Sequence, residues 1–253
     1  MITATAHQST SHASQAKPRQ RGHLVVPDSL HHALTSSARS GVSEARSGTT
    51  IDAAVSAFPS PPSGAADRRD LAATARATHE RTAQGIDRAR QLDAHGNSDL
   101  WHALLDQYGN ELRDISIDDA HALLSHALRA NDAPAGDLKD QFDRSRPYER
   151  NSSISAVVPR PEDQSYPSGH ATDAYTGATI LSGLLPHHST EFHRDAEEVA
   201  YSRVYAGVHH PSDVIRGAQL GSFIGEKALR NELPPEKQSL LDGILNTLGG
   251  LLS

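Results

Sequence analysis

Cysteine is absent from this sequence of 253 residues. The chain can therefore form no disulfide bond, no zinc–thiolate site and no cysteine nucleophile. Long apolar runs are absent as well, because no stretch approaches the roughly 18 apolar residues of a membrane-spanning helix. The most apolar segment, residues 178–185, ends at a proline. The sequence predicts a soluble protein whose nucleophile, if it has one, is another residue type.

Aromatic residues and net positive charge are also scarce. Aromatics make up 4% and hydrophobic residues 36% of the chain, so part of it is expected to join no core. Lysine and arginine number 24 against 31 aspartates and glutamates, which gives a formal net charge of −7. A protein that binds the phosphate backbone usually has a basic surface, so no nucleic-acid partner is expected.

The first 65 residues are rich in Ser, Thr, Ala, Gly and Pro, with no sustained helical or strand period. This composition predicts a disordered polar leader over 1–65, followed by an all-helical domain over 66–253. The start lacks the apolar run of a secretory signal peptide. It resembles the leaders of type III secreted effectors, so delivery into a host cell and a bacterial cytoplasmic location both stay open. The oligomeric state stays open too, a homo-oligomer included.

Helical periodicity dominates the rest of the chain, and the predicted fold class is all-α. The predicted helices cover residues 65–96, 98–109, 116–128, 168–185 and 190–206, and a last one begins at Pro211. Residues 131–136 are expected to break the pattern. Ser116 followed by Asp119 resembles a capping box. Glycines at 217, 221 and 225 lie four apart, which in a soluble chain indicates close helix packing.

Three short segments in the C-terminal half concentrate cations, hydroxyl groups and histidines. In the first, Lys139 and Arg146 lie in the sequence KDQFDRSRP. Taken alone, this segment is typical of a solvated basic loop. The second is YPSGH, where Ser168 is placed to cap a helix and Gly169 lets a ligand approach the backbone. A helix start with free N–H groups favours an anion, and His170 lies beside it as a proton donor.

The third segment is SRVYAGVHHPSD, which carries Arg203, His209 and Asp213. The arginine fork suits two oxygens of a phosphate. Asp213 follows His209 by four residues and is expected to accept from one ring nitrogen, leaving the other unprotonated and nucleophilic. His210 is equally near, but no partner is evident for it, so it is expected to face solvent or pack structurally.

Taken in order, these segments resemble the three-part signature of the type 2 phosphatidic acid phosphatase superfamily. This superfamily also holds class A acid phosphatases and vanadium haloperoxidases. All fixed positions occur in sequence with their internal spacings, and three linked motifs carry a low false-positive risk. The resemblance covers about residues 139–230. It implies a helical bundle of the acid phosphatase type with its site between helices.

The resemblance also implies a role for each residue of the signature. Lys139, Arg146 and Arg203, with Ser168 and the Gly169 amide, are implied to bind the three non-bridging phosphoryl oxygens.

The remaining three residues are implied to do the chemistry. His209 is implied to attack phosphorus and form a phosphohistidine, with Asp213 orienting it, while His170 protonates the leaving alcohol and then activates water. No metal and no cofactor are required, although vanadate or phosphate can occupy such a site.

The leading hypothesis is thus a soluble, metal-independent phosphatase that hydrolyses phosphate monoesters. A vanadium-dependent haloperoxidase is the alternative, since the same residues can hold vanadate; such enzymes are usually much longer. A catalytically inactive interaction module is a third hypothesis, which the loss of a signature histidine would have favoured. The substrate, a small phosphate ester or a lipid head group, is left open.

Overall fold

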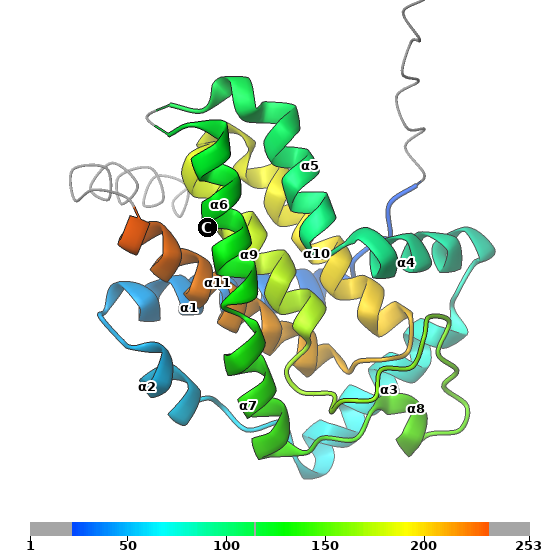
Figure 1. Cartoon of the computed structure of the whole chain (residues 1–253). Coiled ribbons are helices and arrows are strands. Elements are labelled where there is room, and N and C mark those ends of the chain that lie inside the picture. Colours follow the sequence, from blue (N-terminus) through cyan, green and yellow to red (C-terminus); the bar gives the residue numbers. More distant parts are fainter. Residues whose placement is uncertain (1–21, 114, 233–253) are drawn as a thin grey trace, which may run out of the picture.

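The structure, a computed structural model, describes residues 22–113 and 115–232, and these residues form helices with no strand among them. The α-helices are α1 (Asp28–Arg46), α2 (Ile51–Ser56), α3 (Gly64–His79), α4 (Ala83–His95), α5 (Ser98–Tyr108), α6 (Ile117–Arg129), α7 (Asp132–Phe142), α8 (Pro147–Arg150), α9 (Gly169–Leu184), α10 (Ser189–Tyr205) and α11 (Pro211–Glu232). Two short 3₁₀ helices cover Gly109–Glu111 and Pro186–His188. The predicted all-α class is confirmed (Figure 1).

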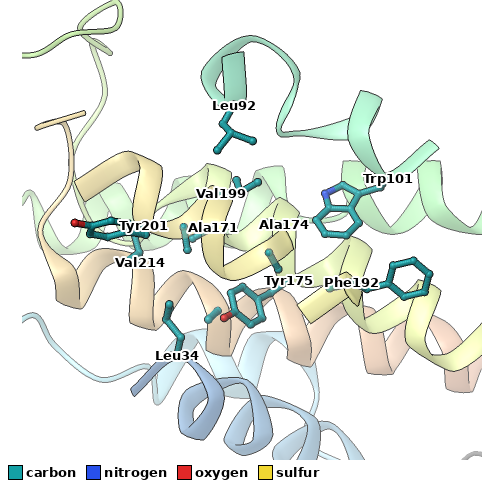
Figure 2. Close-up of a cluster of buried hydrophobic side chains, with 14 of the residues drawn as sticks. Leu34, Leu92, Trp101, Ala171, Ala174, Tyr175, Phe192, Val199, Tyr201 and Val214 are labelled. Carbon is teal, nitrogen blue, oxygen red and sulfur yellow. The ribbon is translucent and has the colours of Figure 1, made fainter. Parts of the chain in front are cut away.

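Helix α9 lies at the centre of the bundle, packed against α10 and α11 (Figure 1). Most of its residues are apolar or small, as a helix surrounded by others requires. Figure 2 shows the main core, where Tyr175 of α9 lies among residues of α1, α5 and α10, including Leu34, Trp101 and Phe192. The predicted end of α9 before Pro186 and the predicted start of α11 at Pro211 are also observed.

The glycines of α11 allow this helix to approach α9 closely. A Cβ atom added to Gly221 would lie 2.1 Å from the carbonyl oxygen of Thr172. One added to Gly217 would lie 2.6 Å from the carbonyl oxygen of Ser168. Backbone atoms cannot yield as a flexible side chain can, so any larger residue would separate the two helices. The packing role predicted for these glycines is confirmed.

The prediction of a disordered leader is wrong for residues 22–65, because this segment contains α1 and α2 (Figure 1). Helix α1 packs along α11, and a Cβ atom at Gly41 would lie 2.1 Å from the carbonyl oxygen of Gln219. The buried face of α1 uses Leu30 and Leu34, then mostly small residues. The Ser- and Ala-rich composition of this segment resembles that of a disordered chain, although its buried residues recur at helical spacing. Residues 1–21, and with them the proposed secretion leader, lie outside the described part.

Two further differences concern helix limits. The single helix predicted over 65–96 is two helices, α3 and α4. The chain breaks between them because Arg81 and Thr82 bind Tyr205 of α10. The Arg81 Nε donates to the carbonyl oxygen of Tyr205 at 2.6 Å, and the Thr82 amide donates to the Tyr205 hydroxyl at 2.8 Å. The break predicted at 131–136 is instead the start of α7, whose third residue, Pro134, needs no amide partner there.

None of the helices in the described ranges is long and apolar enough to cross a membrane.

Candidate active site

The three predicted motifs meet at the ends of five helices. Lys139 lies in the last turn of α7, and Arg146 caps α8 a few residues later. Ser168 caps α9, Arg203 lies in the last turn of α10, and Asp213 in the first turn of α11. Segments far apart in sequence are thereby brought to one place by helix packing.

His209 is buried, and its two ring nitrogens have different partners. Nδ1 lies 2.8 Å from the carbonyl oxygen of Ser165 and 3.3 Å from Oδ2 of Asp213. A carbonyl oxygen can only accept, so Nδ1 carries the proton. Nε2 therefore keeps its lone pair, and it lies 3.2 Å from Nη1 of Arg146. Burial, and the charge of Arg146, lower the pKa of His209 well below its ordinary value, so the ring is neutral near pH 7.

Asp213 has no exposed surface, and several donors hold its carboxylate. Oδ1 accepts from Nη1 of Arg144 at 2.5 Å. Oδ2 accepts from the Ser165 hydroxyl at 2.5 Å and from the His210 amide at 2.8 Å. Burial alone would raise the pKa of Asp213, but the hydrogen bonds from His209 and His210 and the charge of Arg144 hold it well below its ordinary value. This carboxylate is ionised and within reach of the His209 ring, as predicted.

His210 does not face solvent. Its side chain is fully buried, with Nδ1 3.2 Å from Oδ2 of Asp213 and Nε2 3.4 Å from Nη1 of Arg150. Of the two outcomes expected for His210, structural packing is the observed one. Its second nitrogen lies beside Arg150 and not beside Arg146, so His209 is the histidine that faces a predicted phosphate-binding cation.

Lys139 and Arg146 share a carboxylate that the sequence did not predict. Lys139 Nζ lies 3.0 Å from Oδ2 of Asp163, and Arg146 Nη2 lies 2.6 Å from Oδ1 of the same residue. Both cations are buried, with side chains 10% and 3% exposed, whereas the Asp163 side chain is 52% exposed. Burial lowers the pKa of Lys139 from its ordinary value, against the opposing charge of Asp163.

Arg203 and His170 share a second carboxylate, Asp93 of α4. Arg203 Nη1 donates to Oδ1 of Asp93 at 2.5 Å, and Nε2 of His170 lies 3.8 Å from that oxygen. The imidazole is about a quarter exposed, at 24%. Burial and the nearby charge of Arg203 lower the pKa of His170 to about 4. A phosphate dianion bound beside the ring would favour its protonated form and so raise that pKa.

Ser168 and Gly169 form the start of α9 as predicted. The Ser168 hydroxyl accepts from the Ala171 amide at 3.4 Å, and the Ser168 amide donates to the carbonyl oxygen of Asp213 at 3.0 Å. This bond joins the second motif to the third. Apart from its chain neighbours and the backbone of its own helix, no atom of the described chain lies within 4 Å of a Cβ built at Gly169, so the backbone here is open to a ligand.

Sequence reasoning missed the residues that hold the predicted ones in place. Arg144 binds Asp213 and also lies 2.8 Å from Oδ2 of Asp70 and 3.1 Å from Oδ1 of Asp67 on α3. Its position inside the first motif, two residues before Arg146, was an available signal. The sequence held no such signal for Asp93, because nothing in the sequence of an ordinary helix shows which buried cation a carboxylate will pair with.

The family model of the PAP2 superfamily matches residues 121–229, which include all the predicted site residues. Residues 121–229, called the PAP2 region below, are thus similar to the PAP2 superfamily. The resemblance to the type 2 phosphatidic acid phosphatases is thereby confirmed. Arg144, Asp163 and Ser165 lie within the PAP2 region, whereas Asp93 and the α3 carboxylates precede it.

Similar proteins include an undecaprenyl-diphosphatase of Sulfolobus acidocaldarius, 45% identical over 80 residues, or 31% of this chain and 39% of that protein. An acid phosphatase of Zymomonas mobilis is 28% identical over 127 residues, or 47% and 48% of the two chains. The chain thus matches less than half the length of these relatives. A transmembrane PAP2-type phosphatidylglycerolphosphate phosphatase from Bacillus subtilis has a similar fold, with a TM-score of 0.52 and 21% identity over 84% of this chain and 99% of that one.

Proposed function

We propose that the PAP2 region hydrolyses phosphate monoesters through a phosphohistidine on His209, without a metal ion. One observation carries the proposal: the unprotonated Nε2 of His209 faces Arg146, beside Lys139 and at the end of a capped helix. A nucleophile beside buried cations is the arrangement that phosphoryl transfer needs, because that reaction is catalysed chiefly by positioning and charge stabilisation.

The first half-reaction forms the phosphoenzyme. The phosphoryl group takes the Nη donors of Arg146, which frees the lone pair of His209 Nε2. A bond forms from Nε2 to phosphorus as the ester P–O bond breaks, and His170 gives its proton to the departing alcohol oxygen. Arg203, which lies at the His170 side of the site, stabilises the charge on the remaining phosphoryl oxygens.

The second half-reaction reverses these roles. A water molecule attacks phosphorus, its proton passes to the now neutral His170, and the bond from His209 to phosphorus breaks to release inorganic phosphate. Asp213 keeps the Nδ1 proton of His209 directed inward, together with the Ser165 carbonyl oxygen, so that Nε2 stays the reactive atom. At the end of the cycle His209 Nε2 is again unprotonated and His170 again carries its proton.

Metal independence follows from the charge already built into the site. Lys139, Arg146 and Arg203 are all buried, so their charges are only weakly screened by water. Three such cations can neutralise the equatorial phosphoryl oxygens as Mg²⁺ does in other phosphatases. We therefore propose that phosphate itself, or vanadate as its analogue, is the only group that the site must hold.

The proposed substrates are phosphate esters, small or with a lipid head group. The Sulfolobus relative is named for a lipid diphosphate, and the Zymomonas relative is named an acid phosphatase, with no particular ester in its name. No feature of the described residues favours the haloperoxidase alternative over this one, because both chemistries would use the same oxyanion site.

Turnover of nitrophenyl phosphate tests the proposal. We expect the full chain to hydrolyse this ester in EDTA, with inhibition by micromolar vanadate. Loss of activity on chelation, restored by a divalent cation, would contradict the metal-independent mechanism. Bromide oxidation with vanadate and peroxide, without any phosphatase turnover, would instead establish the haloperoxidase.

A further inference from the structure

We propose that Asp163 is an internal anion that occupies the phosphate-binding cations at rest and competes with the substrate for them. The inference rests on the proposed function. Asp163 lies in the connection between α8 and α9, and its carboxylate spans Lys139 and Arg146, at 3.0 and 2.6 Å. These are the two cations of the first motif that the proposed function assigns to the phosphoryl group.

The need for an internal anion follows from burial. Lys139 and Arg146 are nearly inaccessible to water, and a buried charge without a partner is costly. The carboxylate that neutralises them is half exposed, at 52%. A half-exposed carboxylate regains full hydration when it moves aside into water, so a phosphate with greater charge can take its place.

The cations do not depend on the carboxylate for their positions. The backbone carbonyl of Asp163 accepts from Arg146 Nε at 2.8 Å, and that of Gln164 accepts from Arg146 Nη2 at 3.2 Å. Lys139 Nζ also donates to the Gln164 carbonyl. Arg146 Nη1 donates to the Val208 carbonyl at 2.8 Å. These backbone bonds would remain after the carboxylate turns away, which distinguishes a competitor from a scaffold.

Displacement of Asp163 would also release the nucleophile. In the resting arrangement Arg146 uses Nη2 on Asp163 and Nη1 on His209. A phosphoryl group that binds Lys139 and Arg146 takes both sets of donors at once. Entry of substrate would therefore expose the Nε2 lone pair of His209 as it removes the carboxylate.

Binding of inorganic phosphate and vanadate tests this inference, with full-length wild type, Asp163→Asn and a control, Glu162→Gln. The Glu162 carboxylate is the neighbour in the same exposed segment, and none of the described residues forms an ion pair with it. We expect Asp163→Asn to bind phosphate about tenfold more tightly than wild type, since one charge-assisted competitor is removed. The Glu162→Gln variant should bind as wild type does.

Thermal unfolding gives a second measurement. Without phosphate, Asp163→Asn should melt at a lower temperature than wild type, because its cations lack a counter-ion. Saturating phosphate should raise the melting temperature of Asp163→Asn by more than it raises that of wild type. A scaffolding role predicts the lower melting temperature together with weaker binding. If Asp163→Asn is poorly folded, Asp163→Ser removes the same charge with a smaller side chain.

The outcomes separate the inference from the proposed function. Equal or weaker phosphate affinity in the Asp163 variants, in proteins that still hydrolyse esters, overturns the internal competitor and leaves the phosphatase in place. Absence of phosphate binding, vanadate binding and turnover in all folded proteins overturns both. Tighter binding in the Asp163 variants alone supports the inference.

Discussion

The helices before residue 96 and the PAP2 region make different contributions to the site. The PAP2 region supplies the cations and histidines that resemble the family signature. The preceding helices supply carboxylates: Asp93 of α4 pairs with Arg203, and Asp67 and Asp70 of α3 pair with Arg144. One region is expected to carry the chemistry, and the other to hold its cations in place.

This division shows that the signature alone does not make a site. Arg203 has a side chain only 1% exposed, and Asp93 is the carboxylate that pairs with it in the described chain. Arg144 joins α3 to Asp213 and thereby to the His209 ring. Changes in the PAP2 region should therefore affect mainly rate, whereas changes in the earlier helices should affect stability or the geometry of the site.

The largest effect is expected from His209→Ala. Loss of the nucleophile should lower kcat by about three orders of magnitude or more and abolish the phosphoenzyme. The check is rapid-quench trapping with radiolabelled phosphate ester, followed by mass spectrometry of the labelled peptide. Label on His210, or near-normal turnover of His209→Ala, would move the nucleophile to another position.

In the earlier helices, the largest effect should come from Leu34→Ala in α1. Leu34 is fully buried in the main core, so its truncation should lower the free energy of unfolding by about 2–5 kcal/mol. Val25→Ala is the matched control, because Val25 is 87% exposed and lies just before α1. Equilibrium urea unfolding measures both. Equal stability of the two variants would mean that α1 is a dispensable tail after all.

How far the sequence could predict the fold differs between the same two regions. The prolines at 186 and 211 and the serine cap at 168 mark the limits of α9 to α11, so local pattern was enough to predict these helices. Helix α1 buries Ala38, Gly41 and Ala45, whose small side chains fit against α11, but its many serines and small residues are also typical of a disordered segment. Whether such a face is buried depends on a partner about 180 residues away, which no local pattern contains.

The site shows the same limit in electrostatic terms. His209 and Asp213 could be paired from sequence because they lie four residues apart at a helix start. The pairing of Arg203 with Asp93 depends on how α10 packs against α4, and the carboxylate on its own is indistinguishable from any solvated one. Motif spacing thus predicted which residues would form the candidate site, and only the folded chain identifies their counter-ions.

A smaller effect is expected from Asp93→Asn. The amide keeps the shape of the carboxylate but leaves Arg203 without its counter-charge, which should lower kcat/KM by about ten- to a hundredfold. Asp87→Asn on the same helix is the control, since the Asp87 side chain is 61% exposed and its ion pair with Arg90 is long, at 3.9 Å. Steady-state kinetics and melting temperatures of both variants separate a local effect from unfolding. Equal kinetics in the two variants would contradict a role for Asp93 in the site.

The preference for an ester with a good leaving group should depend on pH. We expect the ratio of kcat/KM values for two esters that differ in leaving group to change by up to about tenfold per pH unit. His170 must be protonated to act as an acid, and its pKa in the free protein is lowered to about 4, so its protonated fraction falls as the pH rises above that value. A glycerol phosphate needs that proton more than a nitrophenyl phosphate does. The ratio of kcat/KM for the nitrophenyl ester to that for the glycerol ester should therefore rise with pH.

The control for this measurement is His170→Ala. Its ratio should be high and independent of pH, because the acid is gone at every pH. A ratio that stays flat in the wild-type protein would show that another group protonates the alcohol.

The smallest effect is expected at a helix cap outside the site. The Ser116 hydroxyl accepts from the Asp119 amide at 3.1 Å at the start of α6, so Ser116→Ala should cost about 1 kcal/mol of stability and leave kcat/KM unchanged. Ser168 makes the same kind of cap on α9, at 3.4 Å, but within the proposed phosphate site. Ser168→Ala should therefore lose a similar or smaller amount of stability and, in addition, about tenfold in kcat/KM, because it removes a donor to the phosphoryl group. Unfolding and kinetics of the two variants together distinguish a serine that only begins a helix from one that also binds the substrate, and identical kinetics would reduce Ser168 to the first kind.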